Sequence, residues 1–147
     1  MDTTRLLQLL SRRCQGQLLG VFASNRLPRN LPKRRPLLLV CNTDPHYKPG
    51  EHWIVIFLDA EGNGEYFDSL GDEPRWIFKK FLDRHCARWT CNREQLQSVL
   101  SSFCGHYCVF YCLFKVLNYS MTLIIRCFSR DTSLNDYIVH KFVCDYL

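Results

Sequence analysis

The stretch that most constrains this 147-residue chain is Gln97–Leu113, in which a polar segment leads through a Cys-Gly pair into a mostly apolar run. The run Cys104–Leu117 has the composition and length of a buried helix. Cys104 stands at the N-terminal end of this helix, where unpaired N–H groups and the helix dipole favour a negative charge. A thiolate is such a charge, so we expect the pKa of Cys104 to be lowered and its nucleophilicity raised.

Length and composition indicate a single domain, residues 1–147, with one hydrophobic core. Hydrophobic residues make up 47% of the chain, and no linker-like segment divides it. The formal net charge of +5 is compatible with an anionic partner but does not identify one. The run Tyr107–Leu117 is too short to span a membrane and contains Lys115. We therefore expect a monomer without membrane contact.

Nine cysteines, an odd number, exclude complete pairing within the chain. The N-terminal segment lacks the apolar core and the small-residue cleavage site of a secretory signal. These features predict a reducing compartment and mostly free thiols. A zinc site is the alternative, but the chain has no CxxC pair, and Cys86-x4-Cys91 matches finger spacing poorly. Most of the cysteines are expected to be small core residues.

Hydrophobic patterns and turn residues predict strands and helices in alternation along the chain. The expected strands are Leu37–Cys41, His52–Asp59, Glu65–Asp68 and Trp89–Leu96, with a hairpin turn at Glu61–Gly64. The expected helices are residues 3–13, Pro74–Cys86, Cys104–Leu117 and Ser133–Leu147. The apolar segment Met121–Phe128 is compatible with either type of element.

A basic loop is expected at Asn25–Pro36, which contains three prolines. Its basic residues are Arg26, Arg29, Lys33, Arg34 and Arg35. Two interpretations are open. The loop is either a solvated surface segment or a contact site for nucleic acid or another acidic partner.

A cysteine nucleophile needs a base, and the base needs a group that orients it. His52 begins a predicted strand, and the hairpin partner of that strand ends in Asp68, so the two side chains can meet at one edge of the sheet. The amide of Gln97, together with the backbone N–H of Cys104, can hold an oxyanion. Each residue alone is more often structural. Their order along the chain is far more informative.

Three motifs carry a resemblance to a known family: GEHW, YFDSLG and QSVLSSFCGHYC. They resemble those of the adenovirus-type, or adenain-like, cysteine proteases, and most of all the versions encoded by Polinton/Maverick elements and large DNA viruses. The same clan includes the proteases that remove ubiquitin-like modifiers. The resemblance extends from Gly20 to Leu113, and the segment NDYIVHKFV near the end of the chain shows a weaker similarity.

The resemblance implies a role for each site residue. Cys104 is the expected nucleophile, His52 the base, Asp68 the group that orients it, and Gln97 part of the oxyanion hole. The implied fold is α+β, with a small, mostly antiparallel sheet packed against the helix that bears Cys104. The implied active site is papain-like, with His, Asp and Cys in that chain order. Two departures are visible: adenoviral enzymes have Glu where Asp68 stands, and this chain is shorter after the central helix.

The resemblance also implies a function: a cysteine endopeptidase that processes viral or transposon capsid and core precursors at sites with small residues. It acts in the host nucleus or cytoplasm and in the virus particle, and its chemistry requires no cofactor. DNA and a short peptide are the activators in the family. Here the basic loop is the expected site of DNA contact. Cys86 or Cys91 is the possible disulfide partner of an activating peptide. The alternatives are a protease of ubiquitin or a ubiquitin-like modifier, and a non-enzymatic DNA-binding virion component.

Overall fold

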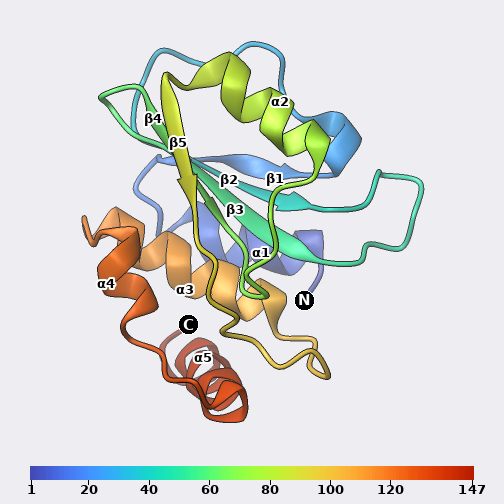
Figure 1. Ribbon diagram of the computed structural model, residues 1–147, viewed down its shortest axis with the longest axis vertical. Coiled ribbons are helices and arrows are strands. Elements are labelled where there is room, and N and C mark those ends of the chain that lie inside the picture. Colours follow the sequence, from blue (N-terminus) through green and yellow to red (C-terminus); the bar gives the residue numbers. More distant parts are fainter.

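The computed structural model describes residues 1–147 and has an α+β fold, as expected, in which one five-stranded sheet separates two layers of helix (Figure 1). The strands, in their order across the sheet, are β1 (Leu18–Phe22), β2 (Leu37–Asn42), β3 (Trp53–Leu58), β4 (Asn63–Phe67) and β5 (Arg88–Cys91). The helices are α1 (Thr3–Ser11), α2 (Trp76–His85), α3 (Cys104–Val116), α4 (Met121–Ile125) and α5 (Thr132–Tyr146), with a 3-10 turn η1 at Ser24–Arg26.

The three central strands, β2, β3 and β4, are antiparallel, and each edge strand pairs in parallel with its neighbour. In the β3–β4 hairpin Val55 lies opposite Phe67 and Leu58 opposite Gly64. This register sets the start of β3 beside the end of β4. The residues that precede β3 and follow β4 therefore come together at one edge of the sheet.

Strands β2 and β3 are buried on both faces, which explains why both are continuous apolar runs. Successive side chains of a strand point to opposite faces. One set packs with α2 in a core that contains Leu37, Leu39, Cys41, Ile54, Ile56, Leu58, Phe78 and Leu82. The other set packs with α1, α3, α4 and α5 in a larger core that contains Leu38, Val40, Val55, Phe57, Leu10, Val109, Ile124 and Val139.

Helix α3 is the centre of the larger core. It packs against β3 and is surrounded by α1, α4 and α5 (Figure 1). Because it is enclosed on most sides, its sequence is apolar nearly all round rather than on a single stripe. The helix begins at Cys104, as the sequence predicts.

The sequence interpretation missed strand β1 and made the fifth strand too long. Strand β1 contains Gly20 and deviates from regular register between Leu18 and Gly20, so its pattern is weak. A side chain at residue 20 would displace the Phe22 ring, because a Cβ at Gly20 would lie 2.8 Å from that ring. The predicted strand Trp89–Leu96 ends at Cys91, because the next residue, Asn92, turns its side chain back onto the backbone beyond β4.

All nine cysteines are unpaired, and Cys14, Cys41, Cys108 and Cys112 lie in the core. No group of three or more His, Cys, Asp or Glu side chains is arranged to hold a metal ion. None of the helices combines the length and the apolar character that a membrane crossing requires.

Candidate active site

Cys104 is the first residue of α3, and only 9% of the residue's surface is exposed at the helix N-terminus. Burial by itself raises the pKa of this thiol. Hydrogen bonds with the His52 side chain and with the backbone N–H groups of Trp53 and Gly105 lower the pKa more, so it falls below the ordinary value of 9.0. The structure thus supports the expected thiolate, with β3 as well as the helix contributing donors.

His52 directly precedes β3 and is fixed by the end of β2. The backbone carbonyl of His52 accepts the N–H of Thr43 at 2.9 Å. The Asn42 side chain accepts the N–H groups of Asp44 and Glu51, which closes the intervening loop. These bonds hold the imidazole, whose side chain is only 11% exposed, between Cys104 and Asp68.

Asp68 follows β4, and its carboxylate is nearly fully buried. Its Oδ1 lies 2.6 Å from Nε2 of His52 and also accepts the N–H of Leu70 at 2.8 Å. The hairpin thus brings together the two side chains that the sequence analysis paired. With Nε2 on the carboxylate, the other ring nitrogen, Nδ1, is the one available to the thiol.

The electrostatics of the three groups favour an ion pair. Burial alone lowers the pKa of His52, but hydrogen bonds with Asp68 and Cys104 raise it more, to about 9. The pKa of Cys104 moves in the opposite direction, downward. Both shifts favour a thiolate beside an imidazolium, which is the reactive form of a cysteine nucleophile.

Gln97 is buried, and both ends of its amide are fixed. Its Oε1 accepts the Ser69 hydroxyl at 2.7 Å, and its Nε2 donates to the carbonyl of Ser101 at 3.0 Å. An amide NH2 has two hydrogens, so one donor remains for an incoming oxygen. The backbone N–H of Cys104 has no acceptor within the chain.

Asp68 and Gln97 are carried by two segments that are bonded to each other. The carbonyl of Ser69 accepts the N–H groups of both Leu96 and Gln97, at 2.8 and 2.9 Å. Asn92 accepts the N–H of Asp68 at 2.9 Å and donates to the carbonyl of Asp68 at 2.6 Å. We call these segments, residues 68–71 and 92–97, the site clamp. The carboxylate and the amide therefore share one rigid support.

Helix α5 holds the clamp from the other side. Asn135 donates to the carbonyl of Leu96 at 3.0 Å, and the Tyr107 hydroxyl joins that same carbonyl to Asp136. Both Asn135 and Asp136 are buried. The polar residues of NDYIVHKFV thus position the segment that contains Gln97.

Sequence reasoning missed Asn92, the clearest positioning residue of the clamp. Replacing Asn92 with alanine would leave the N–H of Asp68 without a partner in a buried place, and the carbonyl of Asp68 would keep only the N–H of Gly71. We expect a loss of about 1–3 kcal/mol in the free energy of unfolding. If Asp68 orients a catalytic base, turnover should also fall by about 10-fold or more with little change in KM. Urea unfolding and steady-state kinetics measure both, with the exposed Asn63→Ala as the matched control.

Two neighbours of the nucleophile have other environments. The ring of His106 packs against Phe103 and His140, and burial lowers the pKa of His106 to about 4. Cys108 is buried in the core, and burial raises its pKa well above 9.0. Neither group matches the properties of a base or nucleophile acting with Cys104.

The pKa values predict selective alkylation of Cys104. At pH 6.5, iodoacetamide should modify Cys104 about 10-fold or more faster than the exposed Cys127, because the lowered pKa of Cys104 increases its thiolate fraction. Substitution of His52 by alanine should remove this preference. Peptide mapping by mass spectrometry after short exposure gives both rates in one sample. Equal rates at Cys104 and Cys127 would contradict the ion pair.

An imidazole, a buried carboxylate and a helix-terminal thiol, in this chain order on an α+β fold, match the arrangement of papain-like cysteine proteases with His-Asp-Cys order. No family model matches the sequence. A segment of 48 residues is 40% identical to the cysteine protease S273R of African swine fever virus (isolate Tick/Malawi/Lil 20-1/1983). That segment covers 31% of this chain and 18% of the relative.

Solved structures of the African swine fever virus pS273R protease match the fold with a TM-score of 0.56. One is 28% identical over 80% of this chain, and a selenomethionine form is 26% identical over 71%. ChlaDub1 of Chlamydia trachomatis matches with a TM-score of 0.55 and 16% identity over 74% of this chain and 57% of its own, a likeness of fold. The chain spans 43% of the viral protease. These matches support the resemblance to the adenain-like proteases, and the chain has the fold of the ubiquitin-like-protease clan.

Proposed function

We propose that this chain is a cysteine endopeptidase that uses Cys104 as nucleophile, His52 as base and Asp68 to orient the base. The observation that carries the proposal is the imidazole held between a helix-terminal thiol of lowered pKa and a buried carboxylate at 2.6 Å. The similarity to a viral cysteine protease supports the same chemistry. Gln97 and the N–H of Cys104 would stabilise the oxyanion.

The geometry supports a two-stage reaction. The Cys104 thiolate attacks the carbonyl carbon of a peptide bond, and the oxyanion forms beside Gln97. The His52 imidazolium gives its proton to the leaving amine, and a thioester remains on Cys104. Neutral His52 then takes a proton from water, which attacks the thioester and releases the acid. Asp68 keeps Nε2 of the ring bonded throughout, so Nδ1 stays directed at the reacting atoms.

The proposed substrates are capsid and core precursors of a DNA virus or related transposon, cleaved near small residues. The proposed enzyme is a monomer that acts in the host nucleus or cytoplasm and in the virus particle. The proposal includes two possible activators, DNA and a short peptide. Within the basic loop, Arg26, Arg34 and Arg35 donate hydrogen bonds to groups of this chain. Arg29 and Lys33 make no such bonds, so they are the residues most available to a DNA backbone.

The decisive experiment incubates the purified chain with candidate precursors and identifies new termini by mass spectrometry. Wild type should cleave, Cys104→Ala should not, and Cys127→Ala, a matched substitution of an exposed cysteine, should cleave like wild type. Labelling of Cys104 by ubiquitin with a C-terminal electrophile, without precursor cleavage, would favour a protease of that modifier. Salt-sensitive DNA binding that survives Cys104→Ala, with no cleavage at all, would favour a non-enzymatic component.

A further inference from the structure

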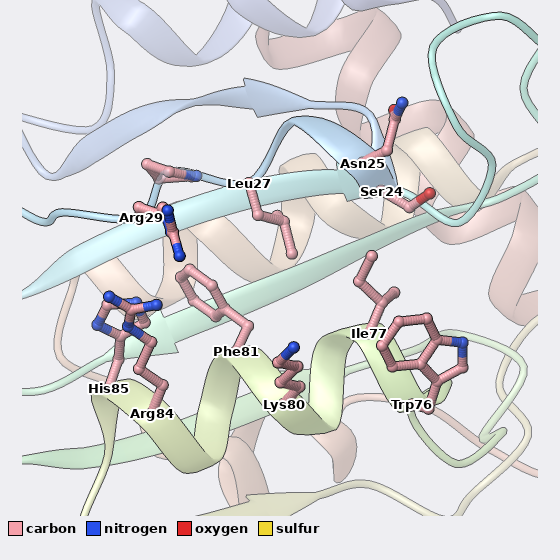
Figure 2. Close-up of a pocket in the computed structure, with 11 residues that line it drawn as sticks. Ser24, Asn25, Leu27, Arg29, Trp76, Ile77, Lys80, Phe81, Arg84 and His85 are labelled. Atoms are coloured by element: carbon pink, nitrogen blue, oxygen red, sulfur yellow. The ribbon is translucent and has the colours of Figure 1, made fainter.

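A hollow of about 250 Å³ lies between α2 and residues 24–29, on the opposite side of the sheet from α3 (Figure 2). None of the four proposed catalytic residues lines it. Pockets that enclose a whole small ligand usually measure roughly 300–1,000 Å³. The hollow is smaller, so it suits one or two side chains of a larger partner. We call it the α2 groove.

The floor of the α2 groove is apolar. Leu27, Ile77 and Phe81 line it, with the leucine on one side and the two α2 residues on the other (Figure 2). Trp76 stands at one end and is 71% exposed, an unusual fraction for so large a ring. Filling this floor with an apolar side chain of a partner would remove apolar surface from water, which favours binding.

The rim of the α2 groove is basic. Arg29, Lys80 and Arg84 line it, are exposed, and make no hydrogen bond or ion pair with this chain. No carboxylate lines the groove. Elsewhere on the surface, basic side chains such as Arg75 and Arg93 are paired with glutamates. Three cations without a partner in this chain therefore surround the open apolar floor.

His85 adds an unpartnered polar atom to this surface. It lines the same end of the groove as Arg29 and Arg84 (Figure 2), and its Nε2 is buried without a hydrogen-bond partner. Burial lowers the pKa of His85, and the positive charges of Arg84 and Arg35 lower it further. The field at this end of the groove is therefore positive, which favours an anionic partner.

The other end of the groove is connected to the active-site loop. Arg75, the residue before Trp76, donates to the carboxylate of Glu51 at 2.9 Å and to the carbonyl of Thr43 at 3.2 Å. The loop closed by these residues leads directly into His52. A polypeptide that leaves the groove past Trp76 would thus reach the region of the catalytic residues.

Charge and shape together favour an acidic peptide over a nucleic acid. A phosphate backbone would pair with the rim but leave the apolar floor empty, and a nucleic-acid site needs a longer track of free cations. The neighbouring Arg26, Arg34 and Arg35 do not extend the track, because they bond to His46, Gly16 and Pro32. A peptide with carboxylates around an apolar residue matches both parts of the surface.

We propose that the α2 groove binds an acidic segment of a partner polypeptide, with an apolar side chain between Leu27, Ile77 and Phe81 and carboxylates against Arg29, Lys80 and Arg84. This is a binding surface separate from the catalytic residues, so the proposal holds whether or not Cys104 cleaves a peptide bond. If it does, the groove would recruit substrates by a sequence remote from the cleaved bond.

The test uses the 147-residue chain carrying Cys104→Ala and fluorescein-labelled 12-residue peptides in which Leu-Phe, Phe-Leu or Leu-Leu is flanked by Asp and Glu. Fluorescence anisotropy at 50 and 200 mM salt measures the affinity. The groove variant Lys80→Glu/Arg84→Glu is compared with the control Arg12→Glu/Arg130→Glu, which changes the same charge at exposed residues elsewhere. Circular dichroism verifies the fold of both.

At least one peptide should bind more tightly than about 1 mM, and the groove variant should weaken it by 10-fold or more, against less than 3-fold for the control. Replacing the apolar pair of the peptide with Ser-Ser should also weaken binding. Equal losses in the two variants, or no binding by any peptide, would overturn the proposal. Tight binding of a DNA duplex, lost in the groove variant while all peptides fail, would assign the surface to nucleic acid instead.

Discussion

Replacing His52 with alanine should lower kcat/KM for peptide-bond hydrolysis by about 10⁴-fold, the size of effect expected when one member of a catalytic triad is removed. His52 is the only imidazole that contacts both the thiol and a buried carboxylate. Without it, Cys104 loses the hydrogen bond that most favours its thiolate, and the leaving amine loses its proton donor. Kinetics on any cleaved precursor peptide measure the loss.

The same experiment distinguishes a concerted unit from independent contributions. The double variant His52→Ala/Cys104→Ala should be hardly worse than either single variant, because groups that act together give non-additive losses. His140→Ala, at an exposed position on α5, is the control and should retain activity. A His52→Ala protein with near-normal turnover would remove the assigned base and with it the proposed mechanism.

The second large effect concerns Asp68 and the pH profile. Activity of the wild type should require thiolate and imidazolium together. It should fall as pH drops through the lowered pKa of Cys104, and fall again as pH rises through about 9, where His52 loses its proton. Asp68→Asn removes the charge that helps to raise the pKa of His52. The alkaline limb should therefore move to lower pH, and kcat should drop by about 10²- to 10⁴-fold.

A stability measurement separates this effect from unfolding. His52 has a folded-state pKa above its ordinary 6.5, so its contribution to stability is complete below that value and is lost as pH rises through about 9. Asp68→Asn should reduce this contribution without abolishing the cooperative transition. If Asp68→Asn lowered kcat but left the alkaline limb of the pH profile unchanged, the Asp68 carboxylate would not act by keeping His52 protonated.

The pattern of local elements made much of this architecture predictable. The apolar runs of β2 and β3, the glycine-rich hairpin and the apolar helix after Cys104 are each strong local signals. Since a hairpin places the start of one strand beside the end of the next, the pairing of His52 with Asp68 followed from local structure. Their catalytic roles, and that of Gln97, rest on chemistry and resemblance and await the variants above.

Features that depend on distant contacts were not predictable. Strand β1 is held by parallel pairing with β2, which its own interrupted pattern does not reveal. Asn92 resembles any polar residue after a strand, and only the fold shows its side chain against the backbone of Asp68. The α2 groove likewise joins the predicted basic loop to a helix that is remote in sequence, with Arg29 as the one shared cation.

The site clamp has a consequence for the two halves of catalysis. In the proposed mechanism Asp68 holds the ring that moves protons, whereas Gln97 stabilises the oxyanion of the tetrahedral intermediates. Because Ser69 and Asn92 join their supports, a disturbance on either segment should slow acylation and deacylation in parallel, and no thioester should accumulate. If a substitution in the clamp slowed deacylation alone, so that the acyl-enzyme accumulated, residues 68–71 and 92–97 would act independently of each other.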